Sequence, residues 1–223
     1  SGGDGADYGF GGSGGGGGSG GDSGSVSGDN HASEMPESLC GTNGLDVAMA
    51  VLKGPVSYLD YDADTGTFTN AVRECALVTS ATRVLGNGWY AVQGTVTIPA
   101  GANLSVVGTA HLILCDGAKL TIPSPGENYA GVRVQGDASL AIYAQAAGTG
   151  ALTATGGDRG AGIGGGSYGS GGTVTINGGT VTATGGSSGA GIGGGDQSAG
   201  GLVTVNGGAV TATGGAWYGA GIG

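Results

Sequence analysis

The chain has 223 residues, of which 58 are glycine and 38% are hydrophobic, and its formal net charge at pH 7 is −10. Glycine has no side chain to bury and loses much backbone entropy when it is ordered, so this composition argues against a conventional globular core. The acidic balance argues against nucleic acid as a partner, because a phosphate backbone would be repelled. No apolar run is long enough for a membrane span.

The first predicted segment, residues 1–38, is rich in glycine, serine and aspartate and is expected to be a flexible linker. Within it, Gly2–Phe10 matches most of a calcium-binding nonapeptide repeat, GGxGxDxUx. The match occurs once, its apolar position is Gly9, and such sites form between stacked turns. We therefore interpret this stretch as linker and expect no metal or other cofactor.

Residues 39–94 have a more ordinary composition and are predicted to be a cap or entrance segment. Asp46–Lys53 is short and apolar, and its pattern fits a cap helix or a buried strand equally. Val56–Tyr61 alternates like a strand, Asp62–Gly66 is typical of a turn, and the chain returns from Thr67. Together these features predict a hairpin.

Three aspartates in this hairpin, Asp60, Asp62 and Asp64, resemble the start of a calcium-binding loop. The glutamate that closes such a loop is missing, because position 71 is Ala71. The pattern therefore favours a turn over a metal site.

From residue 95 to 223, short β-branched stretches recur every few residues, separated by Gly, Asp, Pro or Asn. The spacing is too short for crossover helices, and it predicts an all-β fold. We expect a parallel β-helix (solenoid), in which strands and turns wind around one axis. A closed antiparallel barrel or sandwich is the alternative.

After Leu152 the chain repeats itself at a spacing of 29 residues. One block, Thr153–Gly157, recurs at Thr182 and Thr211, and a second, Val174–Gly179, recurs at Val203. A third block recurs after 29 and then 30 residues, because one copy of a loop has an extra residue. Three short strands in each unit predict one turn of the solenoid, and the extra residue marks an exposed loop.

Alternation within the repeats predicts which side chains face inward. Val174 and Ile176 share one side of their strand, while Thr173 and Thr175 face the other. Stacked repeats bury the apolar side against one another. The asparagines of the two Asn-Gly-Gly turns, Asn177 and Asn206, are predicted to lie one above the other and to form an amide ladder.

The motifs GAGIGGG and TVTINGGTVTATGG, at 160–166 and 173–186, resemble the glycine-rich repeats of large secreted bacterial surface proteins. The preceding stretches LGNGWYAVQGTVTI, LILCDGAKLTI and LAIYAQAAGTGALTATGG look like the segment that introduces those repeats. The resemblance covers residues 56–223 and implies a pectate-lyase-like β-helix of adhesive or carbohydrate-binding character. It specifies no activity, and no functional residues can be carried over from it.

The chain has no initiator methionine and ends within a repeat, at Gly223. These features predict a piece of a longer multidomain chain whose other parts are partners of this one. Together with the acidic, lysine-poor composition and the resemblance, they predict an extracellular or cell-surface location.

An enzyme on this scaffold, a polysaccharide lyase or hydrolase, is the first alternative function. It requires clustered acid and base groups near one bond. Between residues 152 and 223 the only charged residues are Asp158, Arg159 and Asp196, and earlier repeats offer only scattered charges. Arg133 and Asp137 are the best candidate pair, and a surface ion pair is the favoured interpretation. We predict that the chain is not an enzyme.

Two loop slots vary while the framework repeats. The first holds Asp158–Arg159, then Ser187–Ser188, then Ala216–Tyr218, and the second holds Ser167–Ser170, then Asp196–Ala199. A constant scaffold with variable loops is typical of recognition surfaces. Three aromatic residues of these loops, Trp217, Tyr218 and Tyr168, are the candidate binding residues, and host or bacterial glycans are the candidate partners. The alternative is that the rings cover the open end of the solenoid or rest against a neighbouring loop.

A second alternative function is ice binding, because Thr-x-Thr motifs recur in register at Thr153, Thr182 and Thr211. Threonine is also an ordinary exposed strand residue. Four other aromatic residues stand in strand-like contexts and are predicted to be core residues: Tyr58, Trp89, Tyr90 and Tyr143.

The three cysteines, Cys40, Cys75 and Cys115, lack a metal-ligand spacing. Two of them would pair in an exported protein, or all three are small apolar fillers, and the sequence leaves both readings open.

Overall fold

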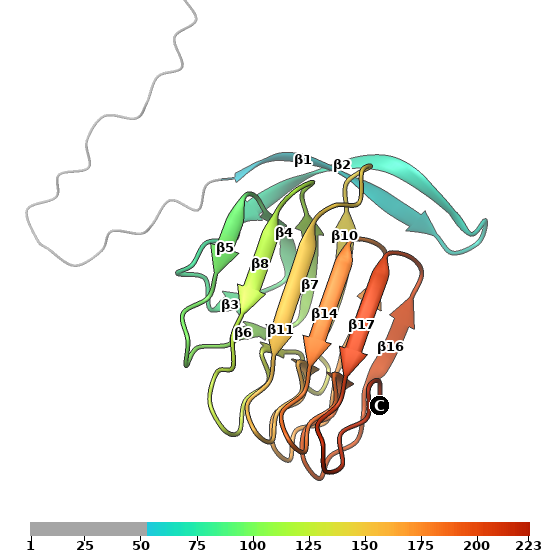
Figure 1. Cartoon of the computed structure of the whole chain (residues 1–223). Helices are drawn as coiled ribbons and strands as arrows, with labels where there is room; N and C mark the ends of the chain where they lie inside the picture. The colour runs from blue at the N-terminus through green and yellow to red at the C-terminus, as the bar shows by residue number, and fades with distance from the viewer. Residues whose placement is uncertain (1–52) are drawn as a thin grey trace, which may run out of the picture. The chain divides into compact units, whose positions relative to one another are not determined.

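The computed structural model describes residues 53–223, which belong to one compact unit. The described residues form 17 strands and no helix, so they contain no helix that could cross a membrane (Figure 1). The predicted linker 1–38, the nonapeptide match, Cys40 and nearly all of the Asp46–Lys53 stretch lie outside the described residues.

The strands form three sheets, which we name by their most distinctive feature. The hairpin sheet has the order β1 (Lys53–Asp62), β2 (Thr67–Leu77), β4 (Gly88–Val92), β7 (Thr109–Leu114), β10 (Ser139–Ala144), β13 (Thr173–Ile176) and β16 (Leu202–Val205). The threonine sheet consists of β5 (Thr95–Thr97), β8 (Lys119–Ile122), β11 (Ala151–Thr155), β14 (Thr180–Thr184) and β17 (Ala209–Thr213). The short sheet consists of β3 (Val84–Leu85), β6 (Leu104–Val106), β9 (Val132–Arg133), β12 (Ile163–Gly164) and β15 (Ile192–Gly193).

From β3 onward the chain visits the short, hairpin and threonine sheets in a constant order, and we call each set of three strands a round. The five rounds are β3–β5, β6–β8, β9–β11, β12–β14 and β15–β17. Every strand pair except β1–β2 is parallel. The predicted all-β class is confirmed, and the alternative of an antiparallel barrel or sandwich is wrong.

Equivalent positions of consecutive rounds are direct strand neighbours, as the repeat spacing predicts. Ile163 pairs with Ile192 in the short sheet, and Val174 pairs with Val203 in the hairpin sheet. At the corner that follows, Asn206 Nδ2 donates a hydrogen bond of 2.7 Å to Asn177 Oδ1. The predicted amide ladder is therefore present.

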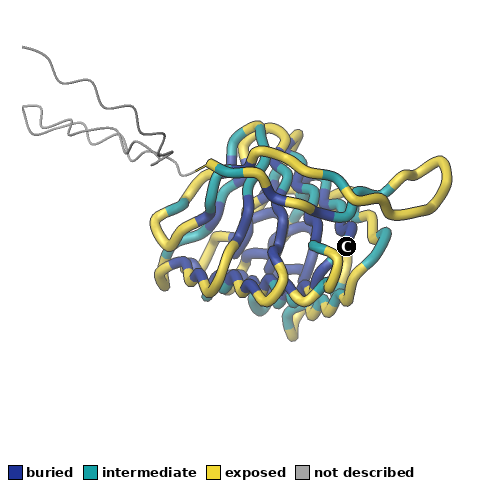
Figure 2. The backbone as a smooth tube through the Cα atoms, turned by 90° about the horizontal axis from the view of Figure 1, so that it is seen from above, coloured by how far each residue is buried: buried dark blue, intermediate teal, exposed yellow. Residues whose placement is uncertain are grey.

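The core lies between the three sheets and contains the inward side chains of the alternating pattern. Val174 and Ile176 are buried, whereas Thr173 and Thr175 beside them are partly exposed. Figure 2 shows buried backbone lining the interior and exposed backbone at the turns. Burial of this apolar side is the main favourable term, because no single round could bury it alone.

Glycine allows the turns of consecutive rounds to stack backbone against backbone. A Cβ added at Gly160 would overlap the carbonyl oxygen of Tyr129, and one at Gly189 would overlap that of Gly160. The loops that carry Gly160 and Gly189 therefore approach one another more closely than any side chain permits.

The predicted hairpin is confirmed, with Asp62 opposite Thr67 across the β1–β2 turn. Asp62 Oδ1 accepts hydrogen bonds from the backbone amides of Asp64 and Thr65, and hydrogen bonding, first of all from Thr65, lowers the pKa of Asp62. The aspartates therefore serve a turn, as the sequence pattern favours.

The β1–β2 hairpin packs against the later strands of its own sheet. The Tyr58 ring lies 4.9 Å from that of Trp89 and 5.0 Å from that of Tyr143. Gln145 Nε2 donates a hydrogen bond of 3.1 Å to the carbonyl oxygen of Ser57. Because these contacts reach from β4 to the turn after β10, the hairpin lies across several strands of the sheet (Figure 1).

The stacked glycines generate the first prediction. Gly160→Ala should lower the free energy of unfolding by about 2 kcal/mol or more, because the methyl group overlaps a backbone atom that cannot rotate away. Gly54→Ala is the matched control: an added Cβ there meets nothing within 4 Å, and the change should stay within about 0.5 kcal/mol. Urea unfolding of both variants measures the difference, and equal stabilities would contradict the stacking argument.

Candidate functional site

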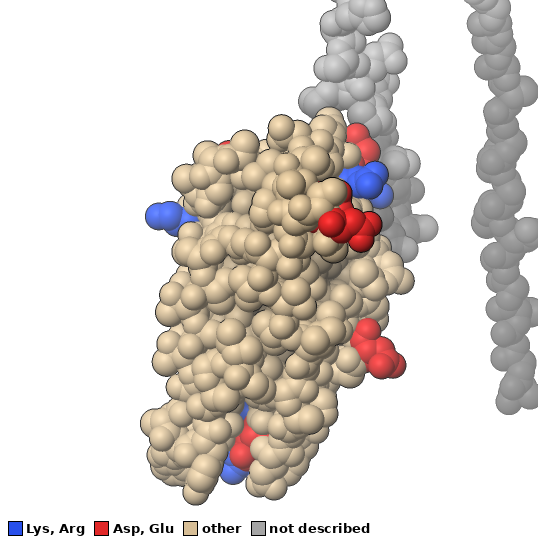
Figure 3. All heavy atoms as spheres, turned by 90° about the vertical axis from the view of Figure 1, so that its right-hand side faces the viewer, with Lys and Arg blue, Asp and Glu red and all other residues tan. Residues whose placement is uncertain are grey.

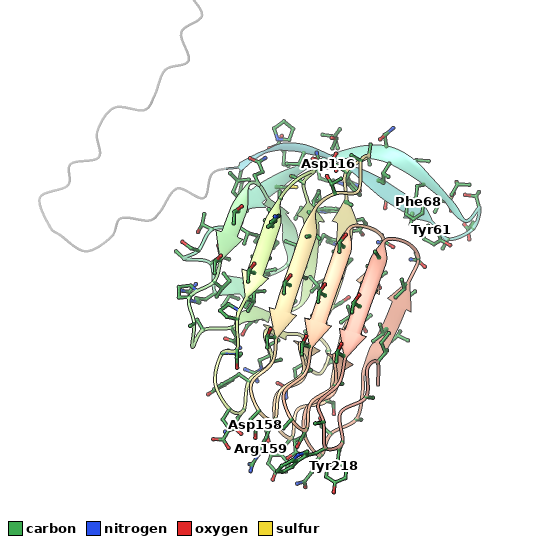
Figure 4. All side chains as sticks on the ribbon, in the orientation of Figure 1. Tyr61, Phe68, Asp116, Asp158, Arg159 and Tyr218 are labelled. Atoms are coloured by element: carbon green, nitrogen blue, oxygen red, sulfur yellow. The ribbon has the colours of Figure 1, made fainter. Side chains whose placement is uncertain are left out.

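The two variable slots lie on either side of the short sheet. The first slot connects the threonine sheet to the short sheet, and the second connects the short sheet to the hairpin sheet. We call their residues together the loop surface: Asp158–Arg159, Ser187–Ser188 and Ala216–Tyr218 in the first slot, and Ser167–Ser170 and Asp196–Ala199 in the second. Figure 4 shows Asp158, Arg159 and Tyr218 together at one end of the described unit.

The structure brings the two slots into contact. The backbone amide of Asp196, in the second slot, donates a hydrogen bond of 2.8 Å to the carbonyl oxygen of Arg159, in the first. The amide of Tyr168 in turn donates to the carbonyl oxygen of Asp196 at 2.9 Å. The two slots therefore form one continuous surface, which the sequence did not predict.

Within the first slot, successive copies stack through their backbones. The amide of Ser188 donates to the carbonyl oxygen of Asp158 at 3.0 Å, and the amide of Trp217 donates to that of Ser187 at 3.0 Å. The Ser187 hydroxyl also donates to the Asp158 carboxylate. This stacking holds the backbone of the slot while its side chains project outward.

Trp217 and Tyr218 occupy the copy of the slot that carries the extra residue. Their side chains are 74% and 89% exposed, so neither ring rests against a neighbouring loop. Solvent exposure of two adjacent aromatic side chains is unusual for a residue type that normally buries most of its area. The close ring pairs among residues 53–223 all involve the hairpin or the sheet beneath it, and none includes Trp217, Tyr218 or Tyr168.

Tyr168 holds its ring outward in an uncommon backbone conformation. It is 68% exposed and has a φ of 56°, in the left-handed region that side chains with a Cβ disfavour. Gln197, 29 positions later, has a φ of 53°. The amide of Gly169 donates to the carbonyl oxygen of Gly166 at 2.9 Å, so a tight turn imposes this conformation.

Charge contributes little to the loop surface. Arg159 Nε lies 3.9 Å from Glu127 Oε1, which is the one ion pair within residues 53–223. Both side chains are largely exposed, so the pair is worth about 0–1 kcal/mol. Figure 3 shows charged side chains as separate small patches on a largely uncharged face.

Arg133 and Asp137 line a shallow groove of about 450 Å³ together with Gln135, and the predicted ion pair between them is wrong. Arg133 Nε instead donates a hydrogen bond of 2.8 Å to Gln135 Oε1, because residues two apart on a strand present side chains to the same face. Asp137 is the only carboxylate that lines the groove.

A packed aromatic cluster lies beneath the hairpin. The Trp89 and His111 rings stack at 4.2 Å, and Arg73 lies 5.5 Å above the Trp89 ring. Burial lowers the pKa of His111 and raises the pKa of Tyr143 to about 12. Tyr58 and Tyr143 are buried, as predicted, and Trp89 is half-buried, so the cluster attaches the hairpin to the sheet.

The two described cysteines, Cys75 and Cys115, are buried and do not form a disulfide with each other. Burial raises the pKa of the Cys75 thiol to about 11, and it also raises that of Cys115. Both are therefore unreactive near neutral pH and act as small apolar core residues. Residues 53–223 also hold no group of three His, Cys, Asp or Glu side chains that could bind a metal ion.

No family model, curated protein or solved structure matches this chain.

The backbone of Tyr168 generates the second prediction. Tyr168→Asn should raise the free energy of unfolding by about 0.5–1 kcal/mol, because asparagine tolerates the left-handed region better than tyrosine does. Tyr129→Asn, at another half-exposed tyrosine without a positive φ, should give no gain. Thermal unfolding of both variants tests this, and a loss of stability at position 168 would show that the ring makes stabilising contacts.

Proposed function

We propose that this chain is a non-catalytic structural or adhesive module of a secreted or cell-surface bacterial protein and that it binds glycans through the loop surface. In this proposal the five rounds are the turns of a parallel β-helix, similar to those of pectate-lyase-like proteins. The location outside the cell follows from the same resemblance and from the acidic, lysine-poor composition.

The order of the strands supports the β-helix. Each round places one strand in each sheet, and each strand pairs in parallel with its equivalent in the next round. Such a fold grows by adding rounds, which suits spacing and display more than catalysis.

The observation that carries the glycan proposal is the exposure of Trp217 and Tyr218 in the copy of the first slot that has an extra residue. Aromatic faces stack on the C–H faces of sugar rings, and both rings are free to do so. Tyr168 adds a third ring whose backbone conformation costs free energy. A conformational cost retained at an exposed residue is typical of binding sites.

A lyase or hydrolase remains the alternative function. The groove around Arg133 is lined by this one cation and by one carboxylate, Asp137. Asp158 and Asp196 do not line it. The separation of the charges favours the non-catalytic proposal.

The third prediction tests glycan binding. On a glycan array, the purified chain should bind a subset of neutral glycans, and Trp217→Ala and Tyr218→Ala should each weaken binding roughly tenfold, because each removes a stacking face. Ser188→Ala is the matched control, since it changes the same slot in the preceding round. Absence of binding by a folded chain would leave a passive stalk as the function.

A second candidate function, ice binding, is favoured by one further observation. Thr97, Thr121, Thr153, Thr182 and Thr211 are successive strand neighbours and form one unbroken row across the threonine sheet. The sequence repeat alone accounts for the last three. A parallel row, Thr155, Thr184 and Thr213, lies two positions further along the strands.

The face that carries these rows is regular and open. Its rows repeat at the strand spacing of about 4.8 Å. Its outward residues are threonine or alanine except for Lys119. No other element lies in front of this sheet in Figure 1. Evenly spaced hydroxyls can order a layer of water at such a face.

The fourth prediction tests the threonine face. If it binds ice, the chain should show thermal hysteresis, and Thr153→Tyr should abolish it by breaking the flat row. Thr204→Tyr, on an exposed outward position of β16 in the hairpin sheet, should leave it unchanged. Ice binding would be rejected if the chain shows no more thermal hysteresis than an equal mass of an unrelated protein in the same buffer.

A further inference from the structure

A groove of about 230 Å³ lies between the hairpin and the corner where the hairpin sheet leads into the threonine sheet. Leu59 and Phe68 line it on the hairpin side, and Asn177, Thr180 and corner glycines line it on the other. Figure 4 shows Phe68 beside Tyr61 near the tip of the hairpin. The groove shares no residue with the loop surface.

A side-chain amide lies in the wall of this groove. Asn177 is 7% exposed and is the one buried polar or charged side chain among residues 53–223. Its Oδ1 accepts the hydrogen bond from Asn206 Nδ2, but its own Nδ2 has no hydrogen-bond partner among residues 53–223. A side-chain amide can donate two hydrogen bonds. Because Asn177 lines the groove, its Nδ2 is a donor that a ligand there could use.

The opposite wall presents an aromatic ring held in place. Phe68 is 39% exposed and packs against Tyr61 with the ring centroids 5.1 Å apart. The Phe68 ring also lies close against the corner backbone, since a Cβ added at Gly207 would lie 2.9 Å from Phe68 Cζ. The ring is therefore positioned before any ligand binds, which lowers the entropic cost of binding.

The lining of the groove selects for a neutral ligand. None of its residues carries a charge: they are glycine, alanine, leucine, phenylalanine, threonine, asparagine and glutamine. A charged ligand would lose hydration there without gaining a counter-charge. An aromatic face opposite amide and hydroxyl groups matches a molecule with an apolar face and a polar rim.

We propose that this groove binds a neutral pyranose ring, with the C–H face of the sugar on Phe68 and a ring hydroxyl accepting a hydrogen bond from Asn177 Nδ2. Thr180 supplies a further polar group on the same wall. This site is separate from the loop surface, so the proposal for the groove and the proposal for the loop surface can be tested independently.

The test uses the methyl pyranosides of glucose, galactose, mannose and N-acetylglucosamine as probes in saturation-transfer NMR with the whole chain. At least one probe should receive saturation at its C–H protons. Phe68→Ala should weaken its binding roughly fivefold or more. Val72→Ala is the matched control, because Val72 is a 60% exposed residue of the same strand that does not line the groove.

Ala209→Phe provides a second variant, in case Phe68→Ala loosens the hairpin. Ala209 is exposed and lines the groove, so the larger side chain fills the space without removing an existing contact. It should abolish binding of the same probe, whereas Trp217→Ala should leave that binding unchanged. The proposal is overturned if no pyranoside receives saturation, or if both Phe68→Ala and Ala209→Phe leave the transfer unaltered.

Discussion

Backbone stacking between equivalent positions of consecutive rounds is the constraint on which the rest of the structure depends. At the glycines that begin the first slot, a Cβ on Gly186 would overlap the carbonyl oxygen of Gly157, and one on Gly215 would overlap that of Gly186. Only an identical chain path in each round permits such approach. Because the paths must coincide, the spacing of 29 residues and the glycine content follow from the same requirement.

The same constraint limits where the chain can vary. Inward positions are filled by small and branched apolar residues, such as Val174 and Val181, whose burial leaves no room for larger side chains. In the repeats, glycine occupies the turn positions where the backbones stack most closely, such as Gly160 and Gly189. Most variation between copies lies in the two loop slots and on the outward faces of the strands, and the proposals for the loop surface and the threonine face rest on these surfaces.

The hairpin is the non-repeating element of the described unit, and it makes one corner of the repeating part different from the others. It contributes the one antiparallel strand pair among residues 53–223, and its aromatic side chains contact strands of several rounds. Because Phe68 comes from this non-repeating element, a repeated corner acquires an asymmetric wall and a groove. A uniform stack of rounds would present the same shallow corner at every step.

The sequence by itself determined the features that depend on local order. The alternation around Val174 and Ile176 specified the buried side of the strand, and the repeat spacing specified which residues become neighbours, including Asn177 and Asn206. The turn at Asp62 followed from its residue types. The candidate residues Trp217 and Tyr218 could also be found from the sequence, because an inserted residue in a repeat marks an exposed loop.

Only the tertiary structure decided which separate stretches meet. The contact of Asp196 with Arg159 joins the loop before β12 to the loop after β15, and no periodicity encodes the distance between these two loops. The place of Thr97 in the threonine row likewise depends on the path of the chain outside the regular repeats. Repetition specifies neighbours one round apart, whereas contacts between different corners are set by the three-dimensional course of the whole round.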